Sequence, residues 1–307
     1  MSFSIFLKDN KNKIFRDIPI REYLLEKKSS YLNEIILNHK FSRTDHKKTY
    51  GKNMLIGGAN GFLGSILLSA KAAIKTGSRY FIVCSNKLHT ETVAMFQNEL
   101  ITMEYSKDVI KQLNNYKVVI IGPGFSKDSW SESIFLDFIN LISRDAISSN
   151  IVIDAGFLYF LSCNPFKYHN WILTPHEGEA SMLLNKSSKW ISNNRIEAAW
   201  LIQKKYSGTV VLKGPNTIIF DGTEIFICKH GGNYMGVAGM GDALTGAIAT
   251  ILHLTENSKP INAISFAIGL HSHAADLIKS SKGPLGILPS DVIEKMSELV
   301  NNFYYDR

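Results

Sequence analysis

The sequence predicts an α/β fold in which a central, mostly parallel sheet is covered by helices on both faces. Short apolar runs rich in β-branched and aromatic residues recur along the chain, as is typical of strands buried on both faces. Helical segments rich in Ala and Leu separate these runs. Several runs also end in turns that contain Gly or Pro. The predicted strands are Asn53–Gly57, Tyr80–Cys84, Val118–Ile121, Ile151–Ile153, Trp171–Leu173 and Thr209–Leu212.

The longer apolar segments predict helices that pack on this sheet. Ile66–Thr76, Ile134–Ile142, Ala243–His253 and Ala263–Ser280 are long enough and have a helical composition. A hairpin is predicted where a turn splits two short apolar runs, Ile218–Phe220 and Glu224–Cys228.

These elements predict one α/β catalytic domain over residues 43–307. Residues 1–42 differ from the rest and are predicted to be a basic, partly helical N-terminal extension. The helical part of that prediction rests on Ile20–Leu37, which is an amphipathic run.

The composition indicates a soluble globular protein. The 307 residues are 45% hydrophobic and 20% charged, and no run approaches the roughly 20 apolar residues of a membrane span. The net charge is +7, and most of it lies in residues 1–52, which hold twelve Lys/Arg and six Asp/Glu. The other 255 residues together carry a net charge of only about +1. We therefore expect neither a nucleic-acid partner nor a membrane partner.

The cysteines and the N-terminus indicate a cytoplasmic protein. Cys84, Cys163 and Cys228 have neither metal-ligand nor redox spacing, and the first residues lack the apolar segment of a signal peptide. An odd number of unpaired cysteines fits a reducing compartment.

The strongest local motif is Gly239-Met240-Gly241-Asp242, which precedes the predicted helix Ala243–His253. Glycines allow backbone N–H groups to approach an anion, and a helix N-terminus favours negative charge. Asp242 is interpreted as a catalytic base beside a phosphate-binding turn, and its simpler alternative is helix capping.

Four further Gly- or Pro-rich turns follow predicted strands. Each alone is explained at least as well by an ordinary turn, but together they predict one crevice for a polyanionic ligand at the carboxyl edge of the sheet. They are Gly57–Ser65, Gly122–Gly124, Thr174–Glu179 and Lys213–Thr217.

No metal site is predicted. His271 and His273 are two residues apart in a predicted helix and therefore point to different faces. The chain has no HExxH, CxxC or Gly-x-Ser-x-Gly motif.

Taken in order, these motifs resemble the ADP- or ATP-dependent NAD(P)H-hydrate dehydratases, a family with a ribokinase-like fold. The resemblance covers roughly residues 43–298. It rests on these segments: His46–Gly51, Gly57–Ser65, Gly122–Gly124, Thr174–Glu179, Lys213-Gly214, Gly239–Gly246, His271 and Ser290–Ile293.

The resemblance implies a lyase reaction coupled to nucleotide hydrolysis, with magnesium and ADP or ATP. Asp242 would be the catalytic base that accepts the proton of the ring hydroxyl during phosphoryl transfer. The hydrated dinucleotide would contact Ser65, Gly124, His176 and Asp242, and the adenine nucleotide would contact Lys213, Gly214, Pro215, Asn216, Thr217, Gly239 and Gly241. The resemblance also implies a homo-oligomer, often a tetramer.

Departures from the family pattern leave two alternatives open. Gly156 stands where the family has the second carboxylate of its DAD motif, and Val237–Met240 replaces TGGT. One alternative is a ribokinase-like kinase of a small vitamin precursor, and the other is a nucleotide-binding relative with weakened catalysis. Whether ADP or ATP is the donor, and whether NADH or NADPH hydrate is preferred, also stays open.

Overall fold

The computed structural model describes residues 20–23, 51–144, 147–255 and 259–305. Within these ranges ten strands form one sheet in the order β1-β10-β9-β8-β7-β6-β5-β2-β3-β4, and β9 is the antiparallel member. The strands are β1 (Ile20–Tyr23), β2 (Asn53–Ile56), β3 (Phe81–Ser85), β4 (Ile101–Glu104), β5 (Val118–Ile121), β6 (Asn150–Ile153), β7 (Trp171–Leu173), β8 (Thr209–Leu212), β9 (Ile218–Phe220) and β10 (Ile225–Cys228).

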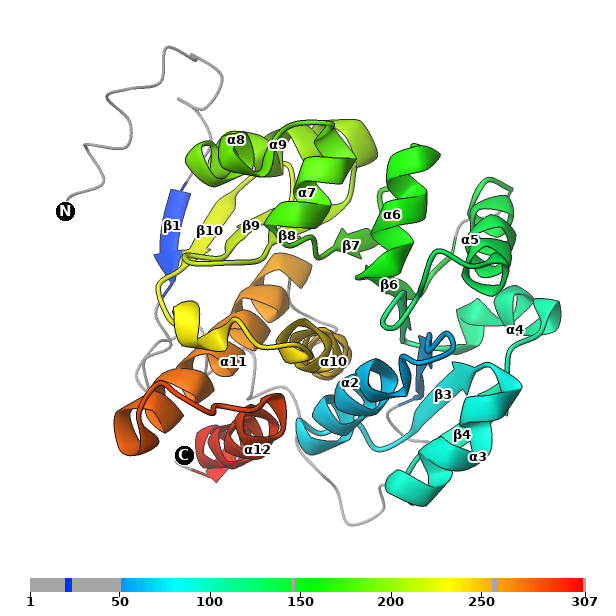
Figure 1. Ribbon diagram of the computed structural model, residues 1–307, viewed down its shortest axis with the longest axis horizontal. Coiled ribbons are helices and arrows are strands. Elements are labelled where there is room, and N and C mark those ends of the chain that lie inside the picture. The colour runs from blue at the N-terminus through cyan, green and yellow to red at the C-terminus, as the bar shows by residue number, and fades with distance from the viewer. Residues whose placement is uncertain (1–19, 24–50, 145–146, 256–258, 306–307) are drawn as a thin grey trace.

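Helices cover both faces of the sheet, as predicted (Figure 1). One face carries α2 (Leu63–Lys75), α10 (Met240–Leu254), α11 (Pro260–Lys282) and α12 (Pro289–Tyr305). The other carries mainly α4 (Lys107–Lys111), α5 (Ser129–Ile142), α6 (Gly156–Cys163), α7 (Glu177–Leu184), α8 (Ser188–Asn193) and α9 (Arg195–Tyr206). Elsewhere in the described residues, α3 (Lys87–Phe96) and the short 3-10 helices η3 (Leu113–Asn115) and η4 (Asn233–Met235) join these elements.

Alternate strand residues enter two separate cores. On β2, Leu55 packs with the α2–α10 side, whereas Met54 and Ile56 pack with the α5–α9 side. Successive side chains of a strand point to opposite faces, so strands buried on both faces must be apolar throughout. This explains why the predicted strands read as continuous apolar runs, and the predicted strands and hairpin are confirmed.

The strand order reverses between β2 and β5. From β2 the chain builds outward to β3 and β4, then returns to place β5 on the other side of β2 and continues through β6 to β8. Ligands of open parallel sheets bind outside the strand carboxyl ends at such a reversal. The turns after β2 and β5 therefore flank the expected position of a ligand.

One helix prediction is wrong. Ile20–Tyr23 was expected to begin a helical run, but it forms β1, which pairs in parallel with β10 from Ile20↔Ile225 to Tyr23↔Cys228. The edge of β10 offers unpaired backbone groups, and pairing with them outweighs the helical pattern of the segment. The rest of the predicted extension, and His46–Tyr50 of the first motif, lie outside the described residues.

Cys84 and Cys228 are buried and Cys163 is exposed. Burial raises the pKa of the Cys84 thiol to about 12. Among the described residues, no helix combines the length and apolar character that a membrane crossing requires.

Helices α2 and α10 cross at very short range. A Cβ atom at Gly246 of α10 would lie 2.0 Å from the carbonyl oxygen of Ser69 on α2. Ser69 Oγ also donates a hydrogen bond of 2.9 Å to the carbonyl oxygen of Asp242. The crossing therefore fixes the N-terminal turn of α10 against α2.

We expect Gly246→Ala to destabilise the protein by about 1–3 kcal/mol, because the added methyl group forces backbone apart in a packed core. Gly64→Ala is the matched control on α2, since a Cβ there meets nothing within 4 Å. Alanine is the better helix former, so the control should be neutral or stabilising. Urea unfolding of both variants gives the comparison, and equal stabilities would contradict the tight crossing.

Candidate active site

Two glycine-rich turns meet at the point where the strand order reverses. Gly58 N–H donates to the carbonyl oxygen of Pro123 at 3.0 Å, and Ala59 N–H donates to that of Gly124 at 2.8 Å. Gly124 has a φ of +70°, and a Cβ there would lie 2.9 Å from the carbonyl oxygen of Phe62. A side chain at position 124 would therefore be strained and would separate the two turns.

Asp242 lies in the first turn of α10, facing the edge where these turns meet. The N-cap residue Gly239, which precedes the helix, has a left-handed φ of +89°. Ser65, in the first turn of α2, donates a side-chain hydrogen bond to the Asp242 carboxylate. The structure thus brings together two of the predicted substrate residues, Ser65 from the first turn of α2 and Asp242 from the first turn of α10.

The environment of Asp242 makes its carboxylate more basic than usual. Burial, together with the charge of Asp154, raises its pKa to about 6, although the Ser65 hydrogen bond and the Lys213 charge oppose the shift. A base with a pKa near the working pH is both ionised and able to hold a proton. Asp242 has this property.

Beneath the Gly239–Asp242 turn, a buried carboxylate and a lysine form an ion pair. Lys213 Nζ lies 2.6 Å from Asp154 Oδ1, and the Asp154 side chain is 2% exposed. Thr174 donates to Oδ1 at 2.8 Å and Thr245 donates to Oδ2 at 2.7 Å, so both carboxylate oxygens are occupied. The Lys213 cation and these hydrogen bonds hold the pKa of Asp154 below its usual range despite burial.

This network places the Lys213 side chain under the backbone of the turn. A Cβ at Gly241 would lie 3.1 Å from Lys213 Nζ, so the glycine permits the close approach of turn and ammonium group. Lys213 was expected to contact the nucleotide. Its ammonium forms the ion pair with Asp154 beneath Gly241, and the nucleotide contact stays a prediction.

The Thr174–Glu179 turn caps α7. His176 Nδ1 accepts a hydrogen bond of 3.1 Å from Glu179 N–H, and Glu179 Oε2 accepts one of 2.8 Å from His176 N–H, which together form a capping box. The His176 side chain remains 60% exposed at the edge, where it can contact a ligand. Glu179 is buried, and its Oε2 lies 3.9 Å from Lys213 Nζ. Burial raises the pKa of the Glu179 carboxyl to about 7.

The turn after β8 is held in place by Arg195, a residue that the motif search missed. Arg195 Nη2 donates to the carbonyl oxygens of Leu212 and Lys213 at 3.0 and 3.2 Å, and Nη1 lies 2.6 Å from Glu177 Oε1. Of the predicted nucleotide residues beyond Lys213, Gly214, Pro215 and Asn216 are exposed and Thr217 is buried.

Asp154, Thr245 and Arg195 are therefore additional residues of the site. Asp154 is a carboxylate directly after a buried strand and Thr245 lies within the Gly239–Gly246 motif, so both had a sequence signal, whereas Arg195 had none.

The two departures from the family pattern have structural reasons. A Cβ at Gly156 would lie 2.4 Å from the carbonyl oxygen of Phe125, so no carboxylate side chain fits there in this backbone arrangement. The Met240 side chain is buried in the core with α2 and α11. A hydroxyl at position 240 would therefore enter the core rather than the crevice.

A cavity of about 390 Å³ opens beside the turn after β2. Asp242 does not line it, and of the five turns only the one after β2 contributes to its lining, through Ala59 and Asn60. Its lining combines aromatic, amide and charged side chains and comprises Ala59, Asn60, Asn86, Lys87, Leu88, Glu104, Tyr105, Asp128 and Trp130.

Comparison with known protein families decides the assignment of this site. The family model for NAD(P)H-hydrate dehydratase matches residues 53–298. The chain belongs to this family. The match spans every described strand from β2 to β10 and all five turns at the crevice, and it confirms the family resemblance.

A curated relative is the bifunctional NAD(P)H-hydrate repair enzyme of Coxiella burnetii. It is 33% identical over 265 residues, which are 85% of this chain and 53% of the relative. The chain thus spans about half the length of the first curated relatives that it matches.

Solved structures confirm the ribokinase-like fold. A ribokinase-like superfamily protein from Enterococcus faecalis has a TM-score of 0.80 at 23% identity, with 96% of this chain and 99% of that chain covered. The ADP/ATP-dependent NAD(P)H-hydrate dehydratase from Bacillus subtilis, co-crystallized with ATP/Mg²⁺, has a TM-score of 0.75 at 20% identity, with 94% and 99% covered.

We expect Asp242→Asn to be more stable than the wild type at pH 8. The folded pKa of about 6 lies above that of an unfolded aspartate, so the wild type loses stability as the pH rises from about 4 to 6. The amide does not ionise, and the difference should vanish below about pH 4. Urea unfolding across this range measures it, with the exposed Glu132→Gln as control. A difference that is constant with pH would contradict the raised pKa.

We expect Lys213→Met to cost about 3–5 kcal/mol at neutral pH, because it leaves the Asp154 carboxylate buried without its cation. The double variant Lys213→Met/Asp154→Asn should recover part of this loss, since the remaining groups are neutral. Denaturant unfolding of the two single variants and the double variant completes the cycle. If the losses of stability in the two single variants simply add in the double variant, the Lys213 and Asp154 side chains do not stabilise each other.

Proposed function

We propose that the chain catalyses the nucleotide-dependent dehydration of hydrated NAD(P)H. The observation that carries this proposal is the placement of Asp242, which lies in the first turn of α10 with a raised pKa, beside Ser65 and above the Lys213–Asp154 pair. Family membership supplies the substrate class, and the Bacillus subtilis neighbour was crystallised with ATP/Mg²⁺.

In the proposed reaction Asp242 accepts the proton of the ring hydroxyl while that oxygen attacks the terminal phosphorus of ADP or ATP. The bond from phosphorus to the leaving nucleotide oxygen breaks, and the ring carries a phosphate ester. The ring-nitrogen lone pair then expels the phosphate, and the adjacent carbon loses a proton to give NAD(P)H. The Gly239–Gly241 turn and the end of α10 stabilise negative charge on the transferring group.

The remaining predicted residues line the two sides of this centre. We assign Gly124 and His176 to the hydrated dinucleotide, since both lie at the edge that holds Ser65. The exposed turn of Gly214 to Asn216 is assigned to the adenine nucleotide together with Thr217, Gly239 and Gly241. Lys213 contributes its charge from beneath the turn.

Magnesium enters this proposal with the nucleotide. Both oxygens of Asp154 already accept hydrogen bonds, and Gly156 removes the second carboxylate of the family pattern. Mg²⁺ commonly takes phosphate oxygens, water and one or two carboxylates as ligands. The phosphates would supply most of its ligands here, and it would offset the charge of the nucleotide.

We also place the protein in the cytoplasm as a homo-oligomer, and both remain predictions. The thiols support the first, since Cys84, Cys163 and Cys228 are free. The second is supported by an exposed apolar surface on α3 and β4, formed by Leu88, Met95, Phe96 and Ile101.

The test is incubation of the purified chain with hydrated NADH or NADPH and with ADP or ATP. We expect the absorbance of reduced nicotinamide to return only when both substrates are present. Asp242→Asn should lower the rate by about 10²–10⁴-fold while nucleotide binding persists. Wild-type kcat/KM should fall about tenfold per pH unit below about pH 6, because the base becomes protonated.

Other outcomes of this experiment identify the alternatives. A stable phosphorylated product from a vitamin precursor would establish a small-molecule kinase that uses the same base. Nucleotide binding without turnover of any of these substrates would identify a relative that has lost catalysis. Near-wild-type turnover by Asp242→Asn would remove Asp242 from the role of base.

A further inference from the structure

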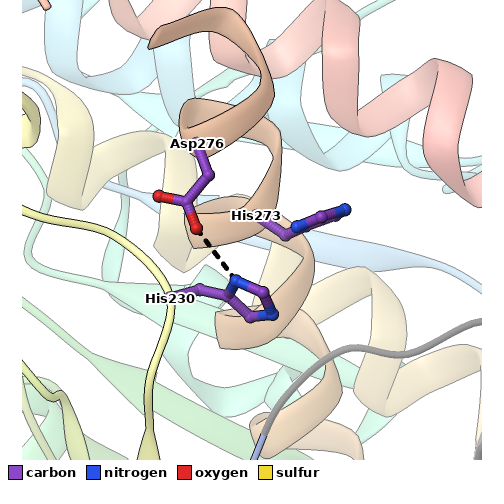
Figure 2. A group of neighbouring side chains, drawn as sticks. All are labelled: His230, His273 and Asp276. Carbon is purple, nitrogen blue, oxygen red and sulfur yellow. Dashed lines mark hydrogen bonds and ion pairs between the residues drawn. The ribbon is translucent and has the colours of Figure 1, made fainter. Parts of the chain in front are cut away.

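A second cluster of ionisable side chains, which does not include Asp242, is formed by His230, His273 and Asp276 (Figure 2). His273 and Asp276 are three residues apart on α11 and therefore lie on one face of that helix. His230 reaches them from the segment that follows β10. The sequence spacing gave no hint of this cluster, because His230 and Asp276 are 46 residues apart.

The three side chains offer ligand atoms at close range. His230 Nδ1 lies 2.9 Å from Asp276 Oδ2, and the His230 and His273 ring centroids are 4.7 Å apart. One ligand atom from each residue lies within 4.8 Å of the other two. Two imidazoles beside one carboxylate form a common ligand set for a divalent transition metal.

His273 provides an independent indication of a ligand. Its Nδ1 is buried and has no hydrogen-bond partner among the described residues. Buried polar atoms are nearly always paired, and an unpaired one costs free energy. A metal ion at this cluster would give the His273 ring a polar partner that the protein itself does not provide.

The carboxylate of Asp276 is already oriented. Its Oδ1 accepts hydrogen bonds from the Gly231 N–H at 3.0 Å and from the Tyr234 hydroxyl, while Oδ2 faces His230. Outer hydrogen bonds of this kind orient metal ligands and strengthen binding. One oxygen is therefore fixed by the protein and the other faces the His230 ring.

We propose that His230, His273 and Asp276 form a binding site for a divalent transition-metal ion of the Zn²⁺ or Co²⁺ type. Imidazole ligands favour these ions over Mg²⁺, which prefers oxygen. Ligand atoms about 2.0 Å from a tetrahedral zinc lie about 3.4 Å apart, so side-chain rotation, chiefly of His273, would have to bring the ligand atoms closer together. The Asp276 side chain is 30% exposed, which leaves access for the ion and a water ligand.

The bound ion would join α11 to the segment between β10 and α10. That segment contains His230, Gly231 and Tyr234 and leads directly into the Gly239–Asp242 turn. An ion that binds only the folded chain stabilises it by mass action. The site is therefore a structural clamp on the segment that precedes the candidate base, and it is separate from the nucleotide's magnesium.

The test uses the tag-free full chain, stripped of metal with a chelator and titrated with Zn²⁺ in the absence of nucleotide. We expect one ion per chain and a Zn²⁺-dependent rise in Tm. His273→Ala and His230→Ala should each weaken binding by at least about tenfold and abolish the rise in Tm. His169→Ala, which removes an exposed imidazole elsewhere, is the matched control and should bind as the wild type does.

A second measurement does not depend on the stability of the variants. Co²⁺ added to the wild-type chain should give the visible absorption bands of a tetrahedral site, and Zn²⁺ should displace them. Failure of the wild type to bind either ion would overturn the proposal. Equal Zn²⁺ affinity in the wild type and both folded histidine variants would also overturn it, because it would place the ion elsewhere.

Discussion

The arrangement of the candidate site depends on one buried ion pair, between Asp154 and Lys213. The pair joins the end of β6 to the end of β8, and its hydrogen bonds extend to Thr174 after β7 and to Thr245 on α10. A buried charge is tolerated only when it is paired and hydrogen-bonded, so each of these elements must keep its position. The orientation of α10, and with it that of Asp242, follows from this requirement.

The strands and their turns could be predicted because both reflect local constraints. Strands such as Val118–Ile121, buried on two faces, must be apolar throughout, and a turn with a positive φ, as at Gly124, favours glycine. Ile20–Tyr23 could not be predicted as a strand, because its alternation is weak and pairing with β10 decides its conformation. Secondary structure at a sheet edge depends on the neighbour more than on the segment itself.

The partners of the charged side chains were beyond the reach of sequence reasoning. Lys213 and Asp154 are 59 residues apart, and nothing in either turn indicates that the two bind each other. The role of Gly156 likewise depends on a backbone contact with Phe125 that only the fold creates. The absence of a second carboxylate at position 156 therefore also follows from packing, because the backbone of Phe125 leaves no room for a side chain there.

The charges around Lys213 bear on how a nucleotide can bind. Asp154, Glu179 and Asp242 surround a single ammonium group, and burial raises the pKa of Glu179 and Asp242 to about 7 and about 6. These shifts show that further negative charge is already costly there. A polyphosphate therefore requires positive charge beyond Lys213, from the N-terminus of α10 and from the metal ion that it carries. The same burial, together with the charge of Asp154, makes Asp242 a stronger base, so the environment that opposes anion binding also favours proton abstraction.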